Sequence, residues 1–160
     1  MPQLTAIAEV RRAIQESILA ETCTLIADGG IRSAGDAIKC MAFGADCVML
    51  GSMLAGCDES CSERVGDCKR IRGMASEAAL AAHQGSRQRY WQEEARKLTP
   101  EGVEGLVKAT GPLANVLQRF CGGLGSGLAH SGAATWAEFK PTCWRQTGAG
   151  IGEGRPHSLQ

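Results

Sequence analysis

Two short apolar runs end in residues that could hold a phosphate group. The run 24–27 ends at Asp28-Gly29-Gly30, and about twenty residues later the run 47–50 ends at Gly51-Ser52. Glycine lets backbone N–H groups approach an anion closely, and the serine hydroxyl can donate one further hydrogen bond. We therefore expect residues 23–52 to form a phosphate site whose ligand is a nucleotide monophosphate.

The elements around these turns follow the order strand, helix, strand. Residues 23–28 and 46–50 have the apolar composition of buried strands. Ser33 is a suitable N-cap for the helix between them, which should reach Phe43, and Asp36 lies near the positive end of its dipole. This order predicts a right-handed crossover with parallel strands. In α/β barrels, the loops after the last two strands commonly form such a phosphate site.

Helical spacing recurs elsewhere in the chain. It predicts a helix over 3–20 with Thr5 as N-cap, one over 76–84 capped by Ser76, one over 112–121, and a short one over 135–139.

Other stretches lack a regular period. The polar residues 57–69 predict an exposed loop, and the charged residues 85–111 predict irregular structure, typical of a functional lid or a disordered segment. The glycines of 121–127 should interrupt the preceding helix, and those of 147–154 exclude regular structure. With only two clear strands the chain cannot close a barrel, so it is expected to be an incomplete part of a larger α/β sheet.

Composition excludes several classes of protein. The chain has 17 basic and 17 acidic residues and gives no electrostatic argument for nucleic acid or an anionic membrane. No segment reads as a membrane span or a signal peptide, which favours the cytoplasm. Among the eight cysteines, Cys57, Cys61 and Cys68 could join His83 at a zinc ion. Their spacing lacks paired C-x-x-C motifs, so we favour neither zinc nor disulfides.

Three motifs carry a resemblance to a known family. Asp28-Gly29-Gly30, Gly51-Ser52 and Arg72-Gly73-Met74 occur in the order and spacing of the IMP dehydrogenase and GMP reductase family. Arg89-Tyr90-Trp91 resembles the flap of IMP dehydrogenases, which GMP reductases lack. The resemblance runs from Pro2 to near the C-terminus and is closest to the C-terminal segment of an IMP dehydrogenase.

The family fold implies a partial (β/α)8 TIM barrel. Residues 1–84 would be βα units with phosphate loops, 85–111 a mobile flap, and 112–160 the C-terminal helices and tail. Two positions depart from the family pattern, because Ile71 replaces a tyrosine and Ala75 replaces a glycine.

The resemblance assigns substrate contacts to seven positions. The carboxylate of Asp28 would accept hydrogen bonds from the ribose hydroxyls. The remaining positions are Gly30, Gly51 and Ser52 at the phosphate, and Gly73, Met74 and Ala75 at the purine.

Catalytic and metal roles are implied in the same way. Arg89 and Tyr90 would activate the water that hydrolyses a covalent intermediate, and Glu101 would line the closed site. The backbone carbonyls of 153–155, from Glu153, Gly154 and Arg155, would bind a potassium ion shared with a neighbouring subunit of a tetramer. NAD would be the second cofactor.

The nucleophile of that reaction is the element the sequence lacks. In the family, a Gly-Ser-x-Cys-Thr loop precedes the stretch that Pro2-Gln3 begins here, and none of the eight cysteines lies in such a motif. We therefore expect a segment of an enzyme that oxidises IMP to XMP for guanine nucleotide synthesis, inactive alone. The alternatives are a GMP reductase fragment, and a non-catalytic fragment that binds a purine nucleotide or an intact homologue.

Overall fold

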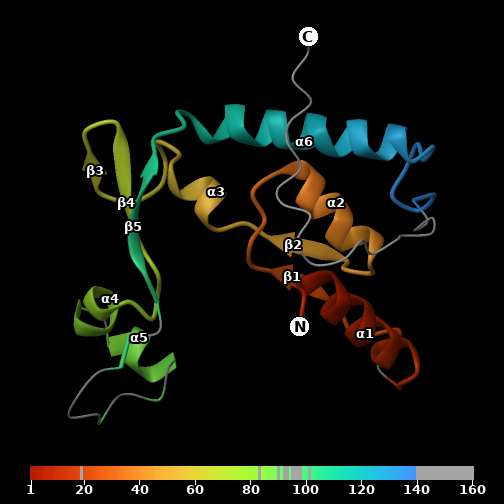
Figure 1. The fold of residues 1–160 in the computed structure, drawn as a ribbon, viewed down its shortest axis with the longest axis horizontal. Helices are drawn as coiled ribbons and strands as arrows, with labels where there is room; N and C mark the ends of the chain where they lie inside the picture. The colour runs from red at the N-terminus through yellow and green to blue at the C-terminus, as the bar shows by residue number, and fades with distance from the viewer. Residues whose placement is uncertain are drawn as a thin grey trace.

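The computed structural model describes residues 1–18, 20–82, 84–89, 91, 94, 99–100 and 102–139. Over these ranges the chain is an α/β structure with one two-stranded and one three-stranded sheet, and neither closes into a barrel. Figure 1 shows two parts, which we call the body and the arm. The body contains α1, α2, β1, β2 and α6, and the arm contains β3, β4, β5, α4 and α5. The short helix α3 (Ser52–Ala55) connects them.

The body contains the predicted crossover unit. Strand β1 (Ile26–Asp28) is followed by α2 (Ala34–Ala42) and then β2 (Cys47–Met49). The two strands pair in parallel, with Ile26 opposite Cys47 and Asp28 opposite Met49. This pairing confirms the parallel arrangement expected from the order of strand, helix and strand.

One face of this strand pair packs on the helices. Ala27 points into the core, and the side chains of Ile26 and Met49 on the opposite face are each 49% exposed. A parallel sheet is normally covered on both faces. The buried core cluster consists of Ile7, Ala27, Ile31, Ala37, Cys40 and Ala45.

Helix α1 (Gln3–Gln15) is tied to the loop before β2 by polar contacts. The Arg11 guanidinium contacts the Asp46 carboxylate and donates from Nε to the carbonyl of Gly44 at 2.6 Å. The Leu25 N–H also donates to Asp46, at 2.7 Å. Burial alone would raise the pKa of Asp46, but these two donors hold that pKa below its usual value.

The predicted start of α1 at residue 3 is confirmed, whereas its predicted N-cap and its predicted end were wrong. The helix begins at Gln3, with Pro2 as the N-cap, and Thr5 lies inside it. It ends at Gln15 and not at residue 20. Ile14 is the last apolar side chain of the helix that is buried, whereas Ile18 is exposed, so no core contact holds a further turn. Proline is well suited to this start because a helix leaves its first N–H groups unpaired anyway.

Helix α6 (Leu113–His130) runs straight through the glycines of 121–127, so the predicted interruption was wrong. Two of these glycines, Gly123 and Gly127, lie against α2. A Cβ at Gly123 would stand 2.6 Å from Cβ of Ala34, and one at Gly127 would stand 1.7 Å from Cδ1 of Ile38. Close packing on α2 therefore offsets the low helix propensity of glycine.

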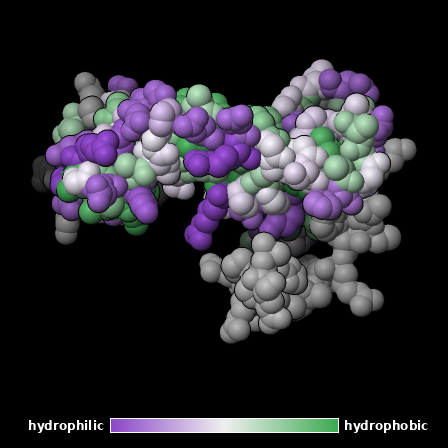
Figure 2. Space-filling model, turned by 90° about the horizontal axis from the view of Figure 1, so that it is seen from above, coloured by the Kyte–Doolittle hydropathy of each residue, from purple (hydrophilic) through white to green (hydrophobic). Residues whose placement is uncertain are grey.

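The sheet of the arm contradicts two further predictions. Residues 57–69 were expected to form an exposed loop, yet they contain β3 (Arg64–Val65) and the start of β4 (Cys68–Arg72). Strand β4 also pairs antiparallel with β5 (Glu104–Lys108), which lies in the stretch expected to be irregular. Figure 2 shows hydrophilic residues, with apolar ones between them, over the arm at the left of the view.

Two short helices lie at the far end of the arm (Figure 1). Helix α4 (Glu77–Ala82) begins as predicted after Ser76, whose hydroxyl accepts a hydrogen bond from the Ala79 N–H at 3.3 Å. Helix α5 (Gln84–Arg89) begins one residue before the supposed flap of 85–111 and extends into it. The prediction of irregular structure over 85–111 is thus wrong at both ends of that stretch.

The region after α6 is only partly described. Residues 135–139 form a single turn and not the predicted helix, although Thr135 Oγ1 does accept a hydrogen bond from the Glu138 N–H. The glycine-rich tail at 147–154 lies outside the described residues. Among the described helices, none is both long and apolar enough to cross a membrane.

Candidate functional site

Parallel pairing brings two of the predicted substrate loops to one edge of the β1–β2 sheet. Asp28, the last residue of β1, lies opposite Met49, the last residue of β2. The chain then continues into Gly29-Gly30 after β1 and into Gly51-Ser52 after β2. The structure therefore places Asp28, Gly30, Gly51 and Ser52 at neighbouring strand ends, as the sequence suggested.

The turn after β1 requires glycine for its backbone. Gly29 has a φ of +99° and Gly30 a φ of +72°, both in the left-handed region that other residues rarely adopt. A Cβ at either position would meet nothing within 4 Å, so both glycines border open space. The side-chain amide of Gln3 holds the turn, because its Nε2 donates to the carbonyls of Asp28 and Gly29, each at 2.9 Å.

The start of α2 adds polar groups beside this turn. The Ser33 hydroxyl accepts from the Asp36 N–H at 3.2 Å and donates to the Asp36 carboxylate at 2.9 Å. The Arg32 N–H donates to the same carboxylate at 3.2 Å. Burial alone would raise the pKa of Asp36, but hydrogen bonds, with Ser33 first among them, and the Lys39 ammonium at 3.1 Å hold that pKa below its usual value.

A cavity of about 290 Å³ opens next to these loops. It lies between the start of α2, the helix α3 (Ser52–Ala55) and α6. Its walls combine two arginines and two hydroxyl groups with apolar side chains. The lining residues are Arg32, Ser33, Ala34, Met53, Thr110, Val116, Arg119 and Phe120.

The predicted purine-binding residues lie elsewhere, in the arm. Gly73, Met74 and Ala75 join β4 to α4, and Figure 1 shows α4 well separated from β1 and β2. The Gly73 N–H donates to the carbonyl of Val103, and the Gly102 N–H donates to the carbonyl of Ala75, each at 2.9 Å. The structure thus does not bring these three residues beside Asp28.

The predicted catalytic and metal residues are described only in part. Arg89 ends α5 and is exposed. Its proposed partners Tyr90 and Glu101 lie outside the described residues, as do the potassium ligands Glu153, Gly154 and Arg155.

Cysteine and metal chemistry can be judged over the described ranges. Within them, no three His, Cys, Asp or Glu side chains lie close enough to hold a metal ion together. Cys57, Cys61 and Cys68 are free thiols, and His83 lies outside the described residues.

Sequence reasoning missed three side chains that hold the loops in place. Gln3 fastens the turn after β1. Glu59 accepts from the Leu113 N–H at the start of α6, at 2.8 Å. Lys69 is buried and donates to backbone carbonyls. None of the three carried a local signal, because Gln, Glu and Lys are mostly exposed residues and nothing in the surrounding sequence marks them as partners of a backbone group.

Comparison with known proteins gives a consistent result. The family model for the IMP dehydrogenase / GMP reductase domain matches residues 1–157. Inosine-5'-monophosphate dehydrogenases from Bacillus subtilis and Aquifex aeolicus are 39% and 42% identical, and in each case the alignment covers 100% of this chain and 33% of the relative. The chain therefore spans about a third of the length of these curated relatives.

A solved structure agrees with the sequence comparisons. A variant of GMP reductase from Trypanosoma brucei, in complex with guanosine 5'-monophosphate, is 38% identical and superposes with a TM-score of 0.77. The superposition covers 100% of this chain and 32% of that one. Because the family model matches residues 1–157, nearly the whole sequence, the chain belongs to the IMP dehydrogenase / GMP reductase family.

Proposed function

We propose that the chain provides part of the nucleotide site of an IMP dehydrogenase, an enzyme of guanine nucleotide synthesis. The observation that carries this proposal is the shared edge of β1 and β2, where Asp28 and the Gly51-Ser52 turn lie at neighbouring strand ends. Asp28 would accept hydrogen bonds from the ribose hydroxyls. Backbone N–H groups of Gly30 and Gly51, with the Ser52 hydroxyl, would bind the 5'-phosphate.

The fold of the complete enzyme would supply the remaining walls. The uncovered face of β1 and β2, with Ile26 and Met49 half exposed, supports a place for these strands in a larger (β/α)8 barrel. In the complete enzyme, Gly73, Met74 and Ala75 would contact the purine from the arm. An intact homologue or further copies of the chain would be the partners, and IMP the ligand.

The chemistry proposed for this chain is binding and water activation. Arg89 and Tyr90, on the flap, would orient the water that hydrolyses the covalent intermediate, with Glu101 beside them. NAD would accept a hydride, but none of the residues assigned in this chain would hold it, so the proposal is confined to the nucleotide. The potassium ligands lie outside the described residues and enter no step.

Binding of IMP to the purified chain, measured by calorimetry, tests this site. We expect Asp28→Asn to weaken binding by about tenfold or more, because the substitution removes the charge that accepts the ribose hydroxyls. Asp67→Asn, which changes an exposed aspartate in the turn between β3 and β4, serves as the matched control and should bind as the wild type does. Equal affinities for wild type and Asp28→Asn would rule out the assigned role.

Turnover is the second test. We expect the purified chain, mixed with IMP and NAD, to form no NADH, because none of its eight cysteines lies in a Gly-Ser-x-Cys-Thr loop. An intact IMP dehydrogenase assayed in parallel shows that the reagents are competent. NADH formation by the chain alone would contradict the proposal.

GMP reductase is the second candidate, because the structure with a TM-score of 0.77 is a GMP reductase in complex with guanosine 5'-monophosphate. The two candidates differ in their use of Arg89. A dehydrogenase needs the flap arginine for hydrolysis, whereas a reductase has no hydrolytic step. Arg89→Met in an intact enzyme carrying this segment should therefore abolish dehydrogenase activity and leave reductase activity unchanged.

A further inference from the structure

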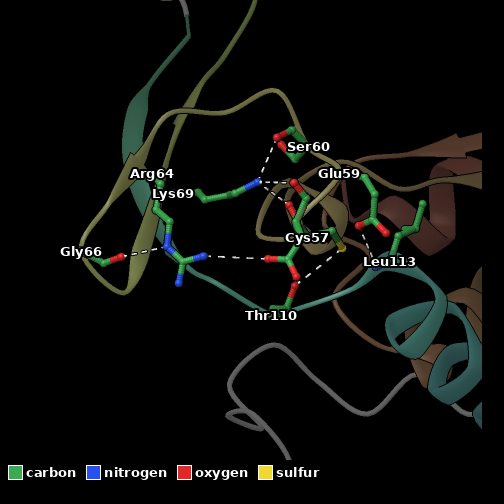
Figure 3. Close-up of polar contacts among 9 residues, drawn as sticks. Cys57, Glu59, Ser60, Arg64, Gly66, Lys69, Thr110 and Leu113 are labelled. Atoms are coloured by element: carbon green, nitrogen blue, oxygen red, sulfur yellow. Dashed lines mark hydrogen bonds and ion pairs between the residues drawn. The ribbon is translucent and has the colours of Figure 1, made fainter.

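Lys69 is a buried lysine whose ammonium is enclosed by backbone carbonyls. It lies in β4 and is 4% exposed. Its Nζ donates to the carbonyl of Cys57 at 2.5 Å, to that of Ser60 at 2.9 Å and to that of Asp58 at 3.1 Å (Figure 3). An ammonium has three N–H donors, and all three have an acceptor here. The cation therefore holds three carbonyls of one loop around a single point.

The same loop is fastened to the segment that enters α6. The Asp58 N–H donates to the carbonyl of Gly111 at 3.0 Å. The Glu59 carboxylate accepts from the Leu113 N–H at 2.8 Å and so caps the first turn of α6 (Figure 3). We call residues 56–60, Lys69 and 108–113 together the joint.

The joint is also closely packed. A Cβ at Gly56 would stand only 2.4 Å from the carbonyl oxygen of Lys108, so the two backbones leave no room for a side chain. The Thr110 N–H donates to the Gly56 carbonyl at 2.9 Å, and the Thr110 hydroxyl lies 3.6 Å from the buried Cys57 thiol. Lys69 is the buried charged side chain that reaches from the arm into this contact, and the exposed Arg64 of β3 adds an ion pair with Asp58 at 4.0 Å.

The position of the joint in the chain gives it a role beyond packing. The loop 57–60 follows α3, which begins at Ser52, and β4 leads from Lys69 directly to Gly73. The joint therefore connects the phosphate part of the proposed site to the purine part. We propose that Lys69 is a positioning residue, whose ammonium fixes where the arm stands relative to the Gly51-Ser52 turn. This inference rests on the function proposed above.

The geometry favours an ammonium over any other cationic side chain. Three acceptors converge on one nitrogen, which matches the compact –NH₃⁺ group, whereas a guanidinium is a planar fork with donors on separate nitrogens. Lys69→Arg should therefore fail to replace lysine, although it keeps the charge. Lys69→Met keeps the apolar stem but leaves the carbonyls of a buried loop without their donor.

Hydrogen exchange and IMP binding test the proposal in the full chain. For Lys69→Met and Lys69→Arg, at a temperature where circular dichroism matches the wild type, we expect the Asp58 and Leu113 amides to exchange about tenfold faster or more. IMP affinity should fall about tenfold as well. Arg70→Met, an exposed residue of the same strand β4 that lies outside the joint, is the matched control and should change neither.

Chemical rescue adds a readout that a general loss of packing would not produce. Lys69→Ala should regain slow exchange at Asp58 and Leu113 when propylammonium is added, because this ion restores an N–H donor group at the vacated point. Tetramethylammonium, which has no N–H donor, should not rescue. Rescue by both ions alike, or wild-type exchange in Lys69→Met, would overturn the proposal.

Failure of the two proposals can be told apart. If the wild-type chain does not bind IMP, the nucleotide site is wrong, while exchange and rescue still decide whether Lys69 holds the joint. If the wild type binds IMP and Lys69→Met binds it equally well, the nucleotide site stands and the positioning role is wrong.

Discussion

Gly123→Leu is expected to lower the free energy of unfolding by about 1–3 kcal/mol, the usual cost of overpacking a contact. Even a Cβ at this position would stand 2.6 Å from Cβ of Ala34, which is fixed to the backbone of α2 and cannot turn away. The larger side chain must therefore push α6 off α2. Chemical denaturation followed by circular dichroism measures the loss.

The neighbouring glycine provides the control. A Cβ at Gly125, two residues along the same helix, would meet nothing within 4 Å. Gly125→Ala should therefore raise the free energy of unfolding by about 0.5–1 kcal/mol, because alanine is the better helix former. If Gly123→Leu were as stable as Gly125→Ala, the close contact between α6 and α2 would be refuted.

Leu80→Ala is expected to destabilise the arm by about 2–5 kcal/mol, the range for a fully buried leucine. Leu80 lies in α4 with 0% of its surface exposed, and its carbonyl accepts from Nε of Arg87 at 2.6 Å. Removing the side chain leaves a cavity between α4 and its neighbours. Amide exchange in α4 and β4 measures the effect where it should arise.

An exposed leucine of the same arm serves as the comparison. Leu106 in β5 is 58% exposed, so Leu106→Ala should cost less than about 1 kcal/mol. Equal losses for the two variants would mean that Leu80 does not hold α4 in place. Unchanged exchange in α2 and α6 in the Leu80 variant would show that arm and body open separately.

The crossover unit could be predicted from the sequence because its signals are local. Apolar runs mark β1 and β2, and Ser33 does accept from the Asp36 N–H as an N-cap should. The arm could not be predicted, because β4 and β5 pair across more than thirty residues and carry charged side chains such as Arg70 and Lys108. Such pairing is decided by long-range contacts and not by local period.

The candidate site also contains residues whose position could be predicted from the sequence and residues whose position could not. Asp28 and Gly51 follow the two predictable strands, so register alone places them at one edge. Gly73 and Met74 depend on the arm, whose course no local pattern indicated. The prediction for α6 was wrong for another reason. Glycine has a low helix propensity, but Ala34 and Ile38 of α2 occupy the space beside Gly123 and Gly127, and this packing is not visible in the local sequence.

The uncovered strand pair also bears on the behaviour of the chain in solution. Within the described residues, β1 and β2 each have one strand neighbour, so their outer edges present backbone N–H and C=O groups in a row. Half-exposed Ile26 and Met49 lie on the uncovered face beside these edges. Such an edge can form backbone hydrogen bonds with a strand of another chain. Unless further strands cover it first, we expect this surface to make the chain self-associate into aggregates as its concentration rises.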